Sequence, residues 1–143
     1  MGLILCQWAR ALGAVVIGTV STQEKAEVAR DAGCDYPVVR SEQNFVSVVR
    51  EITDGEGCAV VYEAIGKETL QKSLDSLRNM GVCAAYGHVS GPPDPIDVIQ
   101  DLGRRGSLFI TRPAIMHYVA KRSDLEWTAR DLFQAIRQGN IDA

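Results

Sequence analysis

The sequence predicts a doubly wound α/β fold, in which helices cover both faces of a parallel β-sheet. Apolar, β-branched runs typical of strands alternate with segments whose apolar residues recur every three or four positions, as in helices. Glycines stand where most of the helical segments end. Strands that alternate with helices at this spacing are joined by right-handed crossovers, so the sheet should be parallel. The 143 residues show no linker, repeat or low-complexity stretch, which predicts one domain.

The chain opens with a predicted helix over residues 3–12. Apolar side chains follow at spacings of three and four from Leu5, and Gly13 ends the helix. Residues 14–20 form a continuous apolar and β-branched run. Such a run predicts a strand that is covered on both faces.

A capping box is the next feature. Ser21 and Glu24 have the spacing of this motif, which opens a predicted helix that closes at Gly33. A short strand over residues 36–39 and a helix over residues 44–52 complete the first half of the chain.

The same alternation repeats in the second half. Residues 59–63 predict a strand, residues 68–80 a helix closed by Gly81, and residues 82–86 another strand. The Gly-Pro-Pro-Asp-Pro segment at 91–95 predicts a loop that no regular element can cross.

The last third of the chain contains three predicted elements. A short helix over residues 96–102 precedes a strand over residues 107–111. Ser123 and Glu126 form a second capping box, and the helix that it opens should run to Gln138.

The beginning of the chain departs from the usual order of such domains. A Rossmann-type fold starts with a strand and a glycine-rich turn, and its first helix begins on that turn. Here the chain starts at the helix, so Gly2 looks like the trailing edge of such a turn. We therefore expect a chain truncated at its N-terminus, without the first strand and most of the turn. The strands at 14–20 and 59–63 would then pair directly, leave a gap, or accept a strand from a neighbour.

Composition excludes several classes of protein. A net charge of −3 argues against a nucleic-acid-binding surface. No segment has the roughly 18 apolar residues that a membrane span needs, which predicts a soluble protein. Cys6, Cys34, Cys58 and Cys83 form no C-x-x-C pair, so we expect reduced thiols, no zinc site and a cytoplasmic location.

The strand ends offer groups that could bind a phosphate. Ser21, Thr22 and Lys25 follow the strand at 14–20, where cofactors without a 2′-phosphate usually meet a carboxylate. Arg40 follows the next strand and should face the same edge of the sheet. Lys25 could equally be a solvated helix charge, Ser21 a simple helix cap and Arg40 a surface loop residue. Gly2 would let a pyrophosphate approach the first helix, or is merely the residue after the start.

The later strand ends offer small and apolar groups that could receive the rest of a nucleotide, because ligands bind outside the carboxyl ends of strands in open α/β sheets. The candidates are Ala64, Ile65, Gly87, His88, Phe109, Ile110 and Thr111. His88 could act as a general acid, but contact with cofactor or solvent is the stronger interpretation. His117 is interpreted as a surface residue.

Several segments together resemble a known family. They are residues 6–14 (CQWARALGA), 17–20 (IGTV), 60–66 (VVYEAIG), 73–77 (SLDSL) and 106–113 (GSLFITRP). In order and spacing they resemble the cofactor domain of the NADPH:quinone oxidoreductases. This is the zinc-free, zeta-crystallin-like branch of the medium-chain dehydrogenase/reductase superfamily. The resemblance covers essentially the whole chain.

The resemblance implies roles for individual positions. Gly2 resembles the last glycine of the family's Ala-Gly-Gly-Val-Gly turn, and Lys25 matches the lysine that binds the 2′-phosphate. Arg40 stands where relatives often carry a tyrosine for the same phosphate. Ala64 stands in place of a serine, and His88 in place of an asparagine near the nicotinamide ribose. Phe109, Ile110 and Thr111 correspond to the strand whose backbone meets the carboxamide.

The resemblance also implies a function. The family holds NADPH so that its hydride faces a quinone or a related electrophilic alkene, in a cleft between this domain and a catalytic domain absent from the sequence. We therefore expect oxidoreductase activity in the full-length protein and little or none in this chain alone. Subunits of the family commonly pair through the strand equivalent to 107–111. This run contains no lysine or proline, so a homodimer through it is expected.

Two other functions remain to be weighed. A stand-alone dinucleotide-binding or sensing module without chemistry would fit the absence of a catalytic domain. A methyltransferase would use a similar sheet, but it generally needs an acidic residue after the second strand, where Ser21 and Thr22 stand here.

Overall fold

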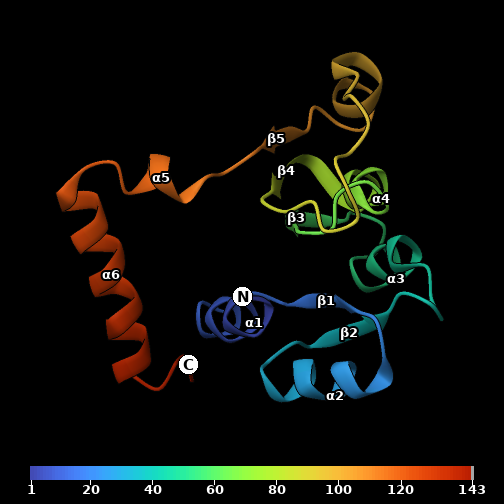
Figure 1. The fold of residues 1–143 in the computed structure, drawn as a ribbon. Coiled ribbons are helices and arrows are strands. Elements are labelled where there is room, and N and C mark those ends of the chain that lie inside the picture. Colours follow the sequence, from blue (N-terminus) through green and yellow to red (C-terminus); the bar gives the residue numbers. More distant parts are fainter. Residues whose placement is uncertain (143) are drawn as a thin grey trace. The chain divides into compact units, whose positions relative to one another are not determined.

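The computed structural model describes residues 1–142. The chain divides into two compact units, which are labelled by element in Figure 1. The first unit comprises residues 1–44 and 116–143, and the second comprises residues 45–115.

The first unit contains a pair of parallel strands and helices from both ends of the chain. Its elements are α1 (Gly2–Ala11), β1 (Ile17–Val20), α2 (Gln23–Asp31), β2 (Tyr36–Val39) and α6 (Arg122–Arg137), with α5 (Ile115–Tyr118) at its boundary. Strands β1 and β2 pair in parallel, with Val20 opposite Val39. Gly13 and Gly33 follow α1 and α2 with φ of +83° and +94°, as expected of glycines that end helices.

Strand β1 is shorter and more open than predicted. It begins at Ile17 rather than at residue 14, and none of its residues is buried. Val15, just before it, is 69% exposed. The expectation of a strand covered on both faces was therefore wrong for this chain. Helices cover the two faces of a strand in a parallel sheet, and in this chain that cover leaves every residue of β1 at least partly exposed.

Both predicted capping boxes were misplaced. Thr22, not Ser21, is the N-cap of α2, and its Oγ1 accepts a hydrogen bond from Lys25 N at 3.3 Å. Helix α6 begins after Lys121, so Ser123 lies inside its first turn. Thr22 and Lys121 have the extended backbone that an N-cap residue requires.

The second unit contains a three-stranded parallel sheet in the order β3-β4-β5. Its elements are α3 (Phe45–Ile52), β3 (Cys58–Glu63), α4 (Leu70–Asp75), β4 (Leu77–Ala85), the π-helix η1 (Val98–Gly103) and β5 (Phe109–Thr111). Residues 91–95 have no regular structure, as their prolines predicted.

The boundary between α4 and β4 differs most from the prediction. The expected helix over 68–80 ends at Asp75, and β4 already begins at Leu77, which pairs with Cys58. Arg50 from α3 donates to the carbonyl oxygens of Asp75 at 2.6 Å and Leu77 at 3.2 Å. The Arg50 side chain therefore donates to carbonyl oxygens that would accept backbone N–H groups if the helix continued.

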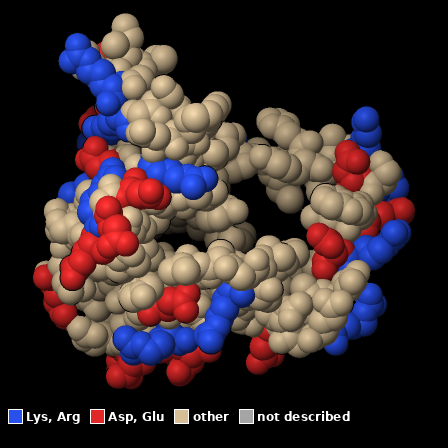
Figure 2. Space-filling view, turned by 180° about the vertical axis from the view of Figure 1, so that it is seen from behind, with Lys and Arg blue, Asp and Glu red and all other residues tan. Residues whose placement is uncertain are grey.

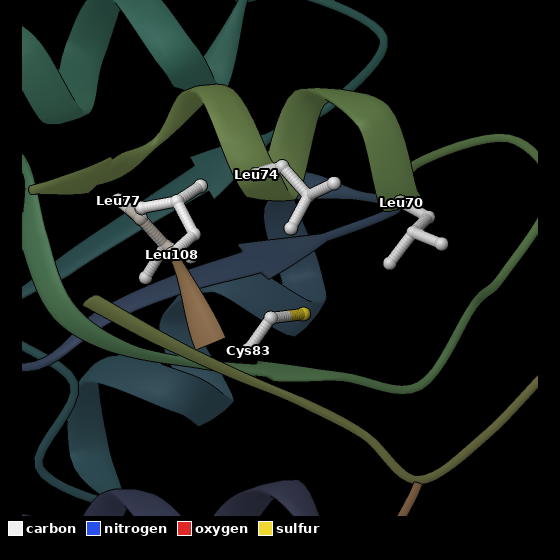
Figure 3. Close-up of a cluster of buried hydrophobic side chains, with 5 residues drawn as sticks. All are labelled: Leu70, Leu74, Leu77, Cys83 and Leu108. Atoms are coloured by element: carbon white, nitrogen blue, oxygen red, sulfur yellow. The ribbon is translucent and has the colours of Figure 1, made fainter. Parts of the chain in front are cut away.

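The core of the second unit lies between α4 and the sheet. Figure 3 shows Leu70 and Leu74 pointing from α4 toward Cys83 of β4. Leu77 and Leu108 complete the cluster, and each of the five is at most 6% exposed. The apolar spacing of α4 is thus explained by burial on one side of the sheet.

The parallel α/β class predicted from the sequence is confirmed. Within the described residues, one unit contains the parallel pair β1-β2 and the other the parallel sheet β3-β4-β5. No helix within residues 1–142 is long and apolar enough to cross a membrane.

Candidate cofactor site

The residues after β1 form a small polar cluster in the first unit. Lys25 Nζ donates to Ser21 Oγ at 3.1 Å, one helical turn apart. Both side chains are exposed. The structure thus brings together the hydroxyl and the ammonium that the sequence assigned to a phosphate.

Arg40 lies at the same edge of this sheet. Its backbone N donates to Val20 O at 3.0 Å, so it continues the β1–β2 pairing by one residue. Its Nε is buried and has no hydrogen-bond partner among the described residues. An arginine nitrogen that is buried without a partner is costly.

Neither cation is neutralised nearby. Within residues 1–142, neither Lys25 nor Arg40 has a carboxylate within 4.0 Å, and the neighbouring Glu42 accepts from Gln23 Nε2 at 2.6 Å. Basic and acidic side chains are interspersed on the face in Figure 2, so a broadly basic surface does not form there. The available positive charge at the ends of β1 and β2 suits one compact anion rather than a polyanion.

Thr22 and Gly2 lie at the starts of α2 and α1. Thr22 Oγ1 accepts from Lys25 N as the N-cap of α2, and its O–H group is still able to donate to a phosphate. Gly2 begins α1, and a Cβ added there would meet nothing within 4 Å. No described atom therefore requires a glycine at this position.

The remaining candidates lie where the three strands of the second unit end. Glu63 pairs with Ala85 and Ala84 pairs with Thr111, so the strands finish at one edge of the sheet. Ala64 and Ile65 follow β3, and Gly87 and His88 follow β4. The structure therefore brings together the candidates of these loops, as the parallel sheet predicted.

Glu63 is a residue of this edge that the sequence interpretation missed. It is 4% exposed, and its carboxylate accepts from four donors. Oε1 accepts from Ile65 N at 2.6 Å, Gly66 N at 3.1 Å and Thr69 Oγ1 at 2.9 Å, and Oε2 accepts from Ser73 Oγ. The available signal was an acidic residue at the end of an apolar strand, a place where burial demands partners.

The glycines of these loops are required by protein contacts. A Cβ on Gly87 would collide with the carbonyl oxygen of Ala64 and lie 2.8 Å from its Cα. Gly66 has φ of +93°, and a Cβ there would lie 2.6 Å from the carbonyl oxygen of Gly91. The glycines let the two loops approach each other, whereas the sequence interpretation had them make room for a ligand.

The other members of the predicted set are accessible. His88 is exposed, and Phe109 of the edge strand β5 is 56% exposed. Ile110 is half-buried and Thr111 is exposed. Arg112, directly after β5, donates to Tyr86 O at 2.5 Å and so links the ends of β4 and β5.

The four cysteines are free, as expected of reduced thiols. Burial raises the pKa of Cys34 to about 11, and the proximity of Cys6 contributes. Burial also raises the pKa of Cys83 to about 11, with a smaller effect from the charge of Glu63. Within residues 1–142 no three His, Cys, Asp or Glu residues are grouped so that they could hold a metal ion.

Comparison with known proteins identifies the family. The sequence profile described as zinc-binding dehydrogenase matches residues 1–130. A 2-haloacrylate reductase from a Burkholderia species is 60% identical over 139 residues, which are 97% of this chain and 42% of that protein. A quinone oxidoreductase from Salmonella typhimurium is 41% identical over 141 residues, 99% of this chain and 43% of that protein.

A solved structure gives the same result. The crystal structure of Escherichia coli quinone oxidoreductase complexed with NADPH matches with a TM-score of 0.92 and 39% identity, covering 99% of this chain and 43% of that one. The chain therefore spans less than half the length of these relatives. The chain carries the cofactor domain of the zinc-binding dehydrogenase family and belongs to its quinone-oxidoreductase branch, within the medium-chain dehydrogenase/reductase superfamily.

Proposed function

We propose that this chain binds NADPH as the cofactor domain of a cytoplasmic oxidoreductase that reduces a quinone or a related electrophilic alkene. The observation that carries the proposal is the group Ser21, Lys25 and Arg40, whose two cations lack carboxylate partners within residues 1–142 and whose Arg40 Nε is buried without an acceptor. This donor set fits a phosphate dianion and would repel no part of it. The NADPH-bound relative and the free cysteines support the proposal.

The residues have distinct proposed roles. Lys25, Arg40 and the Ser21 hydroxyl bind the 2′-phosphate of NADPH, while Thr22 shapes the start of α2. Gly2 at the start of α1 lies next to the pyrophosphate. The remaining contacts are to the nicotinamide and its ribose, from Ala64, Ile65, Gly87, His88, Phe109, Ile110 and Thr111. None of these side chains is proposed to take part in the chemistry.

The chemistry comes from the cofactor, since NADPH supplies a hydride to the electrophilic carbon or quinone ring when it is bound. The chain contributes orientation, because contacts at both ends of the cofactor restrict how the nicotinamide lies. The 60% identity to a 2-haloacrylate reductase supports an electrophilic alkene as substrate, and the quinone oxidoreductases support a quinone.

Two further properties belong to the proposal. Because the groups that face the substrate lie in another domain of such enzymes, the 143-residue chain alone should reduce neither quinones nor haloacrylates at a measurable rate. We also propose a homodimer through β5. The alternative function, a dinucleotide-sensing module without chemistry, shares the NADPH site and differs only in lacking turnover in any longer form.

Isothermal titration of NADPH and NADH tests the function. We expect NADPH to bind more tightly by roughly 2–4 kcal/mol, because two or three charge-assisted bonds would form to the 2′-phosphate. Equal affinities would contradict the proposed phosphate site. Turnover of NADPH with an enone or a simple quinone, in a protein that carries a catalytic domain beside this chain, separates an enzyme from a sensing module.

A further inference from the structure

The loops after β3 and β4 share one buried anchor. Glu63 is 4% exposed, and no cation within residues 1–142 lies within 4.0 Å of its carboxylate. A carboxylate without a counter-ion can be buried only if hydrogen bonds replace its water. Two backbone N–H groups, from Ile65 and Gly66, and two hydroxyls, from Thr69 and Ser73, provide them.

These bonds determine the path of the loop after β3. The Ile65 and Gly66 N–H groups point back to the side chain of the residue that ends the strand. The hydroxyls come from the N-cap and first turn of α4, so the carboxylate joins strand, loop and helix. The carboxylate is therefore a shared acceptor for three consecutive parts of this turn.

The loop after β4 is attached to the same segment. Tyr86 N and Gly87 N donate to Glu63 O at 2.9 and 3.2 Å. Ser90 donates to Ile65 O from its N at 2.7 Å and from its Oγ at 2.8 Å. Ile65 is therefore held from both sides, by Glu63 and by Ser90.

We propose that Glu63 is a positioning residue for the nicotinamide end of the cofactor. Its carboxylate holds the Ala64–Ile65 loop directly and the Gly87–His88 loop through the bonds of Ser90 to Ile65 O. The inference rests on the proposed NADPH function. It assigns Glu63 no contact with substrate and no proton transfer. Glu63 determines where the loop backbones lie. A displacement of these backbones by about 1 Å is enough to lower the affinity for the cofactor.

Helix α4 offers a matched pair of variants. Ser73→Ala removes one donor to Glu63, whereas Ser76→Ala removes a hydroxyl that donates to Lys72 O at 2.9 Å and does not contact the carboxylate. The two serines are 4% and 2% exposed, so the loss of packing is similar. Glu63→Gln, which keeps the size of the side chain but replaces an acceptor oxygen by an NH2 group, is the stronger change.

The readout compares NADPH with 2′,5′-ADP, which carries the 2′-phosphate but no nicotinamide. Ser73→Ala should weaken NADPH binding on the order of fivefold and Glu63→Gln more, while 2′,5′-ADP affinity stays unchanged. Amide hydrogen exchange of residues 64–66 and 86–90 should be faster in Ser73→Ala. Ser76→Ala should alter neither cofactor affinity nor exchange in these loops.

The outcomes separate the two hypotheses. If the unaltered protein fails to bind NADPH, the proposed function fails, and this inference with it. If it binds NADPH but Ser73→Ala matches Ser76→Ala, only the role of Glu63 is overturned. Equal losses for NADPH and 2′,5′-ADP would also overturn it, because they indicate general destabilisation. Should Glu63→Gln not fold, Ser73→Ala decides alone.

Discussion

The ends of β1 and β2 carry the side chains that we propose to bind the 2′-phosphate of NADPH. Lys25 contacts Ser21, and Arg40 carries a buried Nε without a partner. In an unliganded protein such groups cost free energy, and a phosphate would recover it. The identity of a cofactor can therefore depend on two or three residues that contribute little to the fold.

Replacing Lys25 by alanine tests its share of this effect. We expect NADPH affinity to fall by roughly 1.5–3 kcal/mol, because one charge-assisted bond to the 2′-phosphate is lost, while NADH affinity changes little. Lys72→Ala, an exposed lysine of α4, serves as the control. Titration calorimetry with both cofactors gives the answer, and equal losses for NADPH and NADH would refute the assignment.

The buried thiols predict a dependence of stability on alkaline pH. The pKa of Cys34 and that of Cys83 are about 11 in the folded chain against an ordinary value of 9.0. Below pH 9 both states hold these protons, so the thiols are neutral in each. Between pH 9 and 11 the unfolded chain loses them before the folded chain does, and the free energy of unfolding therefore falls, by up to roughly 3 kcal/mol per thiol.

Urea denaturation at several pH values measures this fall. In Cys34→Ala and in Cys83→Ala the decrease between pH 9 and 11 should be shallower than in the unaltered chain, since one titrating group is gone. Tyrosines and lysines titrate in the same range but are common to all three proteins. Identical slopes would show that burial does not perturb these thiols.

At the scale of elements, two adjacent hydroxyl residues at the start of α2 make different contacts. Thr22 caps the helix, whereas the Ser21 hydroxyl contacts Lys25 Nζ. The two residues are adjacent and chemically alike, so sequence pattern alone had assigned the cap to Ser21. Substitution of Thr22 should therefore change stability, and substitution of Ser21 should change cofactor preference.

Thr22→Ala should lower the free energy of unfolding by about 1 kcal/mol, because the cap bond to Lys25 N is lost. Ser21→Ala should leave stability nearly unchanged and instead reduce the preference for NADPH over NADH. Urea denaturation and calorimetry on both variants measure the two effects. A larger loss of stability in Ser21→Ala would restore Ser21 as the cap.

At the scale of the whole molecule, the β5 edge predicts assembly. Strand β5 pairs only with β4 among the described residues, and Phe109 on it is 56% exposed. An apolar edge without lysine or proline favours pairing with another chain. The strand predicted over residues 107–111 is shorter in the structure, since β5 begins at Phe109 and Leu108 is buried. We therefore expect a homodimer joined along β5 at micromolar concentration.

Phe109→Lys should shift the mass measured by light scattering toward the monomer, because a charge on the edge opposes pairing. Met116→Lys places the same charge on a residue that is 73% exposed but outside the strand, and its mass should not change. A monomeric unaltered chain, or equal masses for the two variants, would contradict pairing at this edge.

Local sequence pattern determined the class of the fold and the order of its elements. The alternation of β-branched runs and helical spacing gave the parallel α/β arrangement, and the strand at 36–39 was placed to the residue. It also pointed to Ser21, Lys25 and Arg40, since groups that follow parallel strands share one edge. These features depend on neighbours in the chain, so periodicity reveals them.

The tertiary structure decided what depends on distant partners. Residues 77–80 became strand because Leu77 pairs with Cys58 and Arg50 takes the carbonyls at the end of α4. The hydrogen bonds of the buried Glu63 carboxylate to Thr69 and Ser73 also arose from contacts between separate segments. A hydrogen bond across ten or more residues leaves no periodic trace, because its energy depends on where the folded chain brings the two groups together.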